Sequence, residues 1–571
     1  MPLPSPTYTT ETTAKRTNGP RTTRTTASML VLSWDLPPFL IVDDLAAVTT
    51  QRSRSGVSVW SASLFPRAVQ VGSALSTRSA RETGSSRAAT RRNLSYLDAI
   101  RPNSWVWILF DPHDGRGPDC EIIGLVDRVS RSVTTGRNGT RQTRIRVTGA
   151  GWEKALESTR AMSVPVFSGD ATVDAPTLWD LLEKRFPAAG GTRSRTVPVA
   201  TAVQEIVTAF LGVRAGASAP TTPEAVASVI SEASEGLLRG DETGPLRGQF
   251  NIPHVGRALS EFIRYDIDER VTEVVQVSPA TYWGSLSESA MALTRSHANE
   301  PLNDLIFDVR PLGSRLATRS ASVDTESVAK SLETINAAIA SASEVRDPDL
   351  SGVVGRWAPT ITLRQRPLFE QEVVNTPHRV NLNAEHLASE DIGTSDADLV
   401  NALFLSALGE PGGNIGQRMI QEGRFIDVRS IRRNGLRYSE IEVACWPTAE
   451  LVDVMQSLQP WVRRLYDAYR VNDRLLSGSV TVGAYVRELW AGAALTLTRR
   501  GHGVGPALRT RGESVQEHYI IESIGRAWRY PDAMTTEIQL SRGYTDGAGI
   551  DRAVPQIVGV EASPLTGSAV A

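Results

Sequence analysis

Three side chains near the C-terminus have the types and the spacing of a possible catalytic site. His518, Glu522 and Arg526 lie in EHYIIESIGRAWRYPDAMTTEIQLSRG, residues 517–543. In an extended chain, side chains at even spacing share one face, so these three would point to the same side. A base, an acid and a cation on one face could perform general acid–base chemistry. The same residues could also decorate a structural hairpin, and the surrounding elements must decide between these interpretations.

The compact motifs of enzymes are absent from the rest of the sequence. The seven histidines form no His-Glu-x-x-His pair or other recognised zinc spacing. There is no phosphate-binding Gly-x-x-x-x-Gly-Lys-Ser/Thr loop and no Gly-x-Ser-x-Gly elbow. We therefore predict no catalytic residues, no cofactor-binding residues, no metal ligands and no cofactor.

A murein hydrolase is the main enzymatic alternative, because two carboxylates suffice to cleave a glycosidic bond. Acidic pairs such as Glu261 with Asp266, or Glu300 with Asp304, are available for that role. With 63 acidic residues in the chain, such pairs are also expected by chance. The carboxylates alone do not identify an enzyme.

A carbohydrate-binding or receptor-binding protein is the second alternative. The chain has 12 tryptophans, including Trp105 and Trp107, and indole rings can stack on sugars. Tryptophans within β patterns more often anchor cores and interfaces, and we favour that role here.

Composition indicates a folded protein of several domains. The 571 residues exceed what one core holds, and the hydrophobic content of 41% is ordinary for globular proteins. A net charge of -2 and the lack of a long apolar run predict no sequence-specific nucleic-acid partner and no membrane insertion. Only four of the 61 basic residues are lysines, which reflects either a GC-rich genome or arginine-rich subunit interfaces. The two isolated cysteines fit synthesis in a reducing compartment.

The hydrophobic pattern changes along the chain in the order β, helical, β. Alternating and apolar runs in the first part, with an Asn138-Gly139 hairpin signal, predict strands. Spacings of three and four residues predict helices in the middle. The predicted segments are a Thr/Arg-rich arm (1–27), a first β domain (28–150), a helix-rich mixed domain (151–345), a second β domain with inserted helices (346–543) and a flexible tail (544–571). The arm is either disordered or laid on a partner.

An internal similarity links the two β domains. When Asp119–Arg131 is placed over Glu517–Arg529, apolar residues coincide, Arg128 falls on Arg526 and Arg131 falls on Arg529. Each copy closes its own β region and is followed by a returning strand. The pattern predicts two related β domains within one chain.

The same alignment changes the interpretation of the possible triad. The positions that correspond to His518 and Glu522 are Cys120 and Gly124, so only the arginine recurs. What repeats is therefore an apolar pattern with an arginine. This favours a strand pair that closes a barrel over a catalytic site.

Five sequence strings resemble the baseplate hub family of phage tails, which includes the late control protein D type and the hubs of contractile injection systems. They cover most of residues 100–160 and 280–543, whereas residues 160–280 and both tails match nothing. The strings are HANEPLNDLIFDVRP from His297, WAPTITLRQRPL from Trp357, IGTSDADLVNALFLSAL from Ile392, SGSVTVGAYVRELWAGAALTL from Ser477, and the hairpin from Glu517.

The resemblance implies an α+β chain with two related β-barrel tube domains, separated by the helix-rich segment and assembled as a trimeric pseudo-sixfold ring. Such a hub is a non-enzymatic symmetry adaptor that joins a sixfold tail tube to a threefold central spike and leaves a lumen for DNA. The implied partners are two further copies, the spike protein, the tail tube or tube-initiator protein, baseplate wedge proteins and the tape measure protein. The implied location is the tail baseplate of a virion, after synthesis in the host cytoplasm.

Five residues are candidates for the ring interface. They are Arg128, Arg131, Arg526 and Arg529, with Trp528 beside them. Arginine and tryptophan are common anchors of protein interfaces. Each arginine could instead be a solvated charge at the end of a strand.

Overall fold

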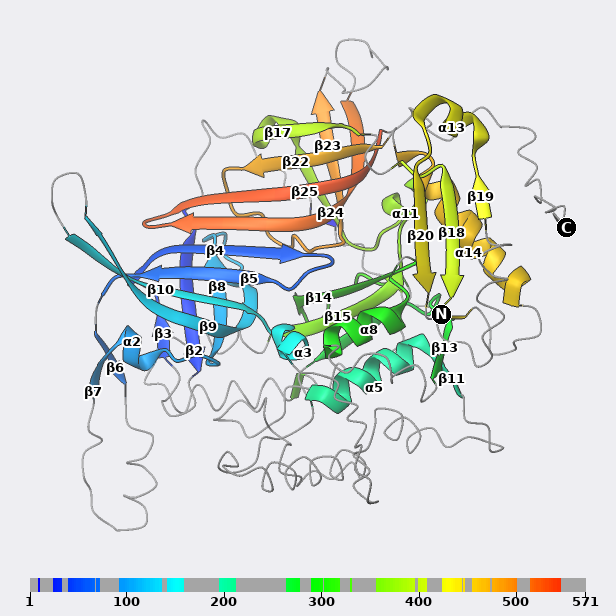
Figure 1. Ribbon diagram of the computed structural model, residues 1–571. Helices are drawn as coiled ribbons and strands as arrows, with labels where there is room; N and C mark the ends of the chain where they lie inside the picture. Colours follow the sequence, from blue (N-terminus) through cyan, green and yellow to red (C-terminus); the bar gives the residue numbers. More distant parts are fainter. Residues whose placement is uncertain are drawn as a thin grey trace, which may run out of the picture.

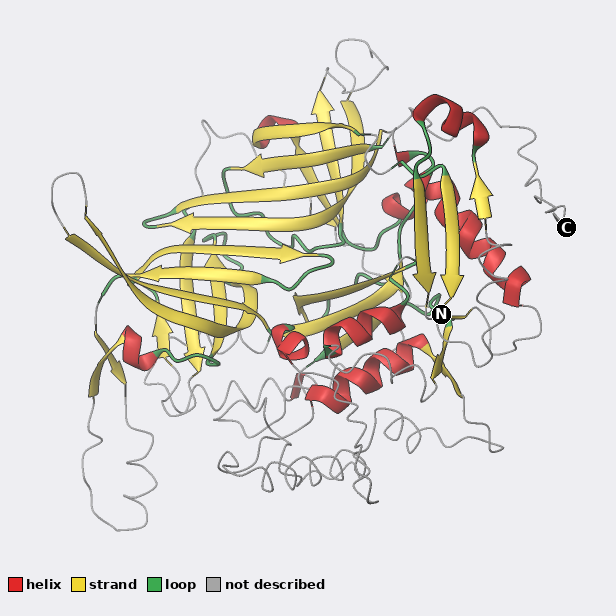
Figure 2. Ribbon diagram, viewed as in Figure 1, coloured by secondary structure: helices red, strands yellow, loops and turns green. Residues whose placement is uncertain are grey.

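The computed structural model describes the chain in segments. These are residues 9–10, 24–32, 39–66, 68–71, 92–135, 141–158, 195–211, 263–277, 289–300, 302–318, 329–330, 356–395, 399–407, 424–443, 445–446, 454–472, 475–500 and 514–545. The Asn138-Gly139 turn, much of the predicted helix-rich domain and most of both terminal segments lie outside them. Within these segments the chain is mostly antiparallel β-sheet with few helices (Figure 2).

A first set of five antiparallel strands, here called the first ladder, follows the order β4-β5-β10-β9-β8. Two further strands, β2 and β3, continue the sheet beyond β8. The bounds are β2 (Thr26–Leu32), β3 (Phe39–Ile41), β4 (Leu45–Ser53), β5 (Val59–Leu64), β8 (Trp105–Asp111), β9 (Asp119–Thr135) and β10 (Arg141–Gly151).

Strand β8 shows how burial shaped the sequence. The run WVWILF is apolar without alternation because both faces of β8 are covered. Trp105, Trp107 and Leu109 face a core shared with helices. Val106 and its neighbours at even spacing face the core of the first ladder. The apolar run thus identifies a strand that lies between two cores.

A second set of five antiparallel strands, the second ladder, follows the order β17-β22-β25-β24-β23. Strand β16 pairs in parallel with β23, and β1 pairs in parallel with β16. The second ladder has its own apolar core. The bounds are β1 (Thr9–Thr10), β16 (Arg379–Asn383), β17 (Leu387–Thr394), β22 (Leu476–Val482), β23 (Ala494–Arg500), β24 (Ser514–Arg529) and β25 (Ala533–Thr545).

The two ladders share one topology. The strands correspond one to one by their places in the two spatial orders: β4 to β17, β5 to β22, β8 to β23, β9 to β24 and β10 to β25. Both sets also follow the same order along the sequence. The first strand of each carries a bulge at the same point, after Leu45 and after Leu387. The predicted internal similarity is therefore present as a repeated strand arrangement.

The turn that enters the third strand is also repeated. The amide of Asn103 donates to the carbonyl of Val126, and the amide of Gly492 donates to the carbonyl of Ile521, each at 2.7 Å. Both turn residues have a positive φ, 62° for Asn103 and 79° for Gly492. Asn and Gly are the residues that tolerate this conformation best. The repeated turn shows which residues of the two ladders are structurally equivalent.

A third layer lies beside the ladders (Figure 1). Its sheet has the order β12-β15-β14, and helices α3, α5 and α8 pack with it around one core. Strand β15, which the sequence grouped with the second β domain, belongs to this sheet. The bounds are β12 (Arg264–Ile267), β14 (Asn303–Pro311), β15 (Trp357–Gln365), α3 (Lys154–Ser158), α5 (Val199–Leu211) and α8 (Ala290–Ala298).

Smaller elements complete the described fold. One sheet, β19-β18-β20, packs against α14, which contains Pro460. No helix in the described part of the chain has the length and apolar character to cross a membrane. The bounds are β6 (Ala68–Val71), β7 (Arg92–Ser95), α2 (Tyr96–Ala99), β11 (Arg195–Pro198), β13 (Val274–Val277), α11 (Glu370–Val374), η2 (Ala384–His386), β18 (Ala402–Ala407), β19 (Arg424–Ile426), α13 (Val428–Asn434), β20 (Tyr438–Val443), β21 (Cys445–Trp446) and α14 (Val454–Tyr469).

Candidate functional site: the junction of the two ladders

The two ladders are joined edge to edge within the chain. The second half of β24, Ser523–Arg529, pairs in antiparallel fashion with Ala47–Ser53 of β4. In Figure 1, β24 in orange lies beside β4 in blue, and a 14-stranded sheet results. The first strand of the first ladder, β4, is thus hydrogen-bonded to the fourth strand of the second ladder, β24. Two equivalent units are joined in a head-to-tail manner.

Arg526 lies at the centre of this junction. It is 2% exposed, and its guanidinium forms an ion pair with Glu121 on β9 of the first ladder. The guanidinium also stacks over the ring of Tyr485 at 4.3 Å and donates to the carbonyl of Val486 at 2.7 Å. Because both charges are buried, removing Glu121 would leave the Arg526 guanidinium without its ion-pair partner. The pair ties the two ladders together.

The third layer contributes to the same network through Asp308 on β14. Arg52 on β4 forms ion pairs with Glu121 at 3.0 Å and with Asp308 at 2.9 Å, and it also donates to the carbonyl of Leu489. Arg52, Arg526, Glu121 and Asp308 together balance two positive and two negative charges in a buried setting. This group of ion pairs therefore connects segments of both ladders and of the third layer.

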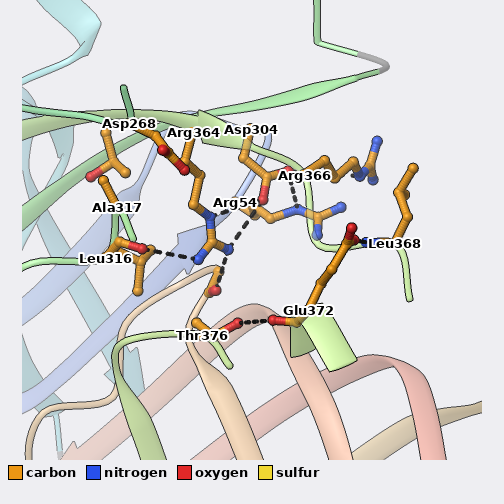
Figure 3. Close-up of polar contacts among 12 residues, drawn as sticks. Arg54, Asp268, Asp304, Leu316, Ala317, Arg364, Arg366, Leu368, Glu372 and Thr376 are labelled. Atoms are coloured by element: carbon orange, nitrogen blue, oxygen red, sulfur yellow. Dashed lines mark hydrogen bonds and ion pairs between the residues drawn. The ribbon is translucent and has the colours of Figure 1, made fainter. Parts of the chain in front are cut away.

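A second cluster extends the network along β14 and β15, and Figure 3 shows its members converging. Three guanidinium groups surround the Asp304 carboxylate. The distances to it are 3.1 Å from Arg364, 3.7 Å from Arg366 and 3.8 Å from Arg54. Burial would raise the pKa of the Asp304 carboxyl, but the three guanidinium groups outweigh it and hold the pKa below its usual value. Arg54 also pairs with Glu522 of β24 at 3.2 Å. This cluster too connects both ladders and the third layer.

Glu153 is a buried carboxyl close to Asp308 of this network, and it accepts its hydrogen bond from a backbone amide. Its Oε1 accepts a hydrogen bond from the amide of Ser58 at 2.6 Å, and the residue is 1% exposed. Burial raises its pKa to about 7, and the charge of Asp308 adds to the effect. Glu153 is therefore close to its midpoint of titration at neutral pH.

The three residues of the possible catalytic triad have separate structural partners. The imidazole of His518 lies 3.0 Å from the Thr496 hydroxyl, and Glu522 pairs with Arg54. Arg526 points into the junction with Glu121. The bulge at Glu522 interrupts the even spacing on which the triad rested. The structure assembles no catalytic triad from these side chains.

The acidic pairs considered for glycoside hydrolysis also have structural partners. Asp266 is buried and accepts hydrogen bonds from the amides of Leu316 and Ala317. Glu300 forms an ion pair with Arg295 on α8 at 2.5 Å, and Asp304 belongs to the arginine cluster. Glu261 lies outside the described residues. No group of three or more His, Cys, Asp or Glu side chains suitable for a metal ion occurs in the described segments.

The five interface candidates divide into two groups. Arg526 and Trp528 are buried at the in-chain junction, and the Trp528 indole donates to the carbonyl of Thr25 at 2.6 Å from within the core of the first ladder. Arg128, Arg131 and Arg529 are exposed. Arg526 therefore contacts a neighbouring ladder, but that neighbour belongs to the same chain.

The structural register differs from the sequence alignment by three residues. Val126 corresponds to Ile521, because their amides donate to the equivalent carbonyls of Ser104 and Ala493, each at 3.0 Å. Each is followed by a bulged acidic residue. Counting onward, Arg131 and not Arg128 corresponds to Arg526. The bulges and the unequal hairpin lengths hid this register from a gap-free alignment.

Sequence reasoning missed the partners of Arg526. Glu121 interrupts the apolar run CEIIGLV, Asp308 and Arg310 interrupt LIFDVRP, and Arg52 lies within β4. A charge inside an otherwise apolar strand was the available signal, since buried charges occur in compensated groups. Which charges compensate one another could not be read from the sequence.

Comparisons with known proteins gave similarity at the level of structure only. No family model and no curated protein matches the sequence. A tail protein from Neisseria meningitidis is 9% identical, with a TM-score of 0.42, and the match covers 91% of this chain and 96% of that chain. The 43 kDa tail protein of prophage MuSo2 from Shewanella oneidensis is 9% identical, with a TM-score of 0.39 and coverage of 90% and 96%. An E. coli component of the type VI secretion system is 8% identical, with a TM-score of 0.30 and coverage of 88% and 74%.

Proposed function

We propose that this chain is a structural hub of a phage tail or of a related contractile injection particle, and that three copies assemble into a closed ring. The observation that carries the proposal is the in-chain junction, where two ladders of the same topology meet head to tail through β4 and β24. A head-to-tail contact that recurs closes into a ring when its rotation divides a full turn evenly, and it otherwise gives an open filament. One chain then supplies two consecutive units of that ring.

A ring of three such chains has two symmetries at once. Its six ladders present a pseudo-sixfold surface, whereas the third layer and the smaller elements, found once among the described residues of each chain, follow the threefold symmetry of the trimer. In this proposal the pseudo-sixfold side accepts the tail tube or a tube-initiator protein, and the threefold side carries a central spike. Wedge proteins surround the ring, and the tape measure protein and DNA pass along its axis.

The buried network suits a permanent structural part. Each carboxylate of the junction described above accepts a hydrogen bond or forms an ion pair with a neighbouring side chain or amide, as Glu121 does with Arg526. A buried pair of this kind fixes geometry, and an interrupted one is strongly destabilising. The proposed role is therefore mechanical and non-enzymatic, with the junction holding the angle between successive ladders.

Native mass spectrometry of the full chain, followed by electron microscopy of the same sample, tests this function. The expected result is a trimer that appears as a ring with six similar densities around a lumen. A monomer at micromolar concentration, or an assembly without a ring, would refute the hub. The same preparation should leave peptidoglycan intact in a zymogram, and clearing would instead support the murein hydrolase.

A further inference from the structure

Two edges of the ladders, at the places equivalent to the in-chain junction, have no partner strand in the part of the chain that the structure describes. The first half of β9 pairs with β8, but among the described residues 128–135 pair on one side only, with β10. Within the described segments, strand β17 pairs with β22 alone. In the ladder topology, these two edges correspond to the edges of β24 and β4 that form the in-chain junction. The described part of the chain thus carries both halves of a second junction of the same kind.

The register of that second junction follows from the first. Arg131 pairs with Ile145, which is opposite Leu64, and Leu64 is opposite Leu45. In the second ladder the corresponding path runs from Arg526 through Thr536 and Val482 to Leu387.

Leu45 and Leu387 are therefore equivalent, and each is followed by a bulged alanine. Counting three residues onward, Val48 corresponds to Glu390. On the other side of the junction, two residues beyond the Arg131–Arg526 match, Val133 corresponds to Trp528. Because Trp528 pairs with Val48 in the in-chain junction, Val133 is expected opposite Glu390 of another copy.

The exposed side chain of Val133 supports this register independently. Trp528, at the equivalent position, is 2% exposed and inserts into the core of the first ladder. Val133 is 49% exposed and is among the large hydrophobic residues that the fold leaves at the surface. An apolar side chain beside an unpaired strand edge is suited to burial by a partner. The exposure of Val133 is what an unfilled second junction would leave.

The two edges also have complementary charge. Arg128 and Arg131 are exposed on β9, and Glu390 and Asp391 are exposed on β17. Glu390 forms an ion pair with Arg499 at 2.9 Å, and its side chain is nevertheless 37% exposed. Opposite charges on neighbouring strands stabilise a pairing, and like charges oppose it. A basic edge and an acidic edge on one chain favour contact between copies in one direction only.

We infer that the outer half of β9 of one copy pairs in antiparallel fashion with β17 of the next, with Ser132 opposite Asp391 and Val133 opposite Glu390. This rests on the proposed ring and identifies its contact. The occupant of each edge is a second copy of the same chain, because the in-chain junction already shows this pairing between the equivalent strands. Three such contacts close the ring.

Disulfide trapping in the full chain tests the register. Ser132 and Asp391 are both exposed, so the variant S132C/D391C is expected to fold and to form covalent dimers and trimers under mild oxidation. The matched control S130C/D391C moves one cysteine along the same face to a diagonal position about 7–8 Å away, which exceeds the usual reach of a disulfide. The single variants S132C and D391C control for the two natural cysteines.

The outcomes separate the contact from the function. Covalent trimers from S132C/D391C, with little product from the control and the single variants, would support the inference. A trimer in native mass spectrometry without this cross-link, or with stronger linkage of S130C/D391C, would overturn the register and leave the hub standing. A chain that remains monomeric would overturn both.

A second variant tests the contact without cysteines. Val133→Asp places a carboxylate opposite Glu390, and we expect the trimer to dissociate at concentrations where the unchanged protein remains assembled. Val59→Asp is the matched control, because Val59 is 47% exposed but lies on β5, which is paired on both sides. Equal trimer yields from the two variants would contradict the inference.

Discussion

Replacing Glu153 by Gln should change the pH dependence of stability in a direction that the structure specifies. The carboxyl is buried, and its pKa is raised from an ordinary 4.5 to about 7. Gln keeps the oxygen that accepts from the amide of Ser58 at 2.6 Å, and it removes the ionisation. The substitution therefore isolates the proton of one side chain.

The sign follows from the raised pKa. Below about pH 4.5 the carboxyl is neutral in both the folded and the unfolded chain, and its contribution to stability is complete. Between pH 4.5 and 7 the unfolded chain ionises while the folded chain keeps its proton, so the free energy of unfolding decreases. The loss amounts to about 3 kcal/mol at and above pH 7. Glu153→Gln should abolish this loss and exceed the natural chain in stability by that amount at pH 8.

Urea unfolding followed by tryptophan fluorescence measures the effect, since Trp152 is adjacent in sequence and buried. The free energy of unfolding of both proteins should be compared at pH 4.5, 6 and 8. The two should be nearly equal at pH 4.5 and should diverge as the pH rises. Parallel curves over this range would show that Glu153 titrates normally and would refute the argument from its burial.

Four further substitutions test the repeated architecture. Trp528→Ala removes a buried anchor and the indole bond to Thr25, and we expect it to lower the free energy of unfolding by about 3–5 kcal/mol in urea titrations. Glu121→Gln leaves two buried guanidinium groups without their shared carboxylate, and a loss of about 3–5 kcal/mol should appear as a lowered melting temperature. Gly492→Ala should destabilise by at least about 1–2 kcal/mol, because its φ is 79° and a Cβ would meet Ile306. Asn103→Gly at the equivalent turn should be nearly neutral in the same thermal assay, and an equal loss would argue against the shared turn.

Several elements were readable from the sequence because local chemistry specifies them. The helix α5 follows the apolar spacing of VATAVQEIVTAFL, and β8 follows its unbroken apolar run. The hairpins of β9 with β10 and of β24 with β25 follow from alternating residues. Their mutual similarity could also be detected, because apolar positions recur wherever equivalent strands face equivalent cores.

The register of the repeat depended on features that carry no clear local signal. A bulge adds one residue to a strand and shifts all later side chains to the other face. Asp127 and Glu522 are bulged at the same structural position but at different distances from the ends of their hairpins. A gap-free alignment therefore matched Arg128 with Arg526, whereas the backbone pairing matches Arg131 with it.

The sequence by itself indicated two related β units, because alternation and apolar runs are local consequences of burial. Only the tertiary structure decided that Arg526 meets Glu121 across the two units and that β24 completes the edge of β4. These contacts join residues more than 400 positions apart, and the free energy of a buried ion pair depends on geometry and burial rather than on sequence neighbours. Among the described residues the same geometry leaves edges of β9 and β17 without a partner strand, and the proposed contact between copies uses these edges.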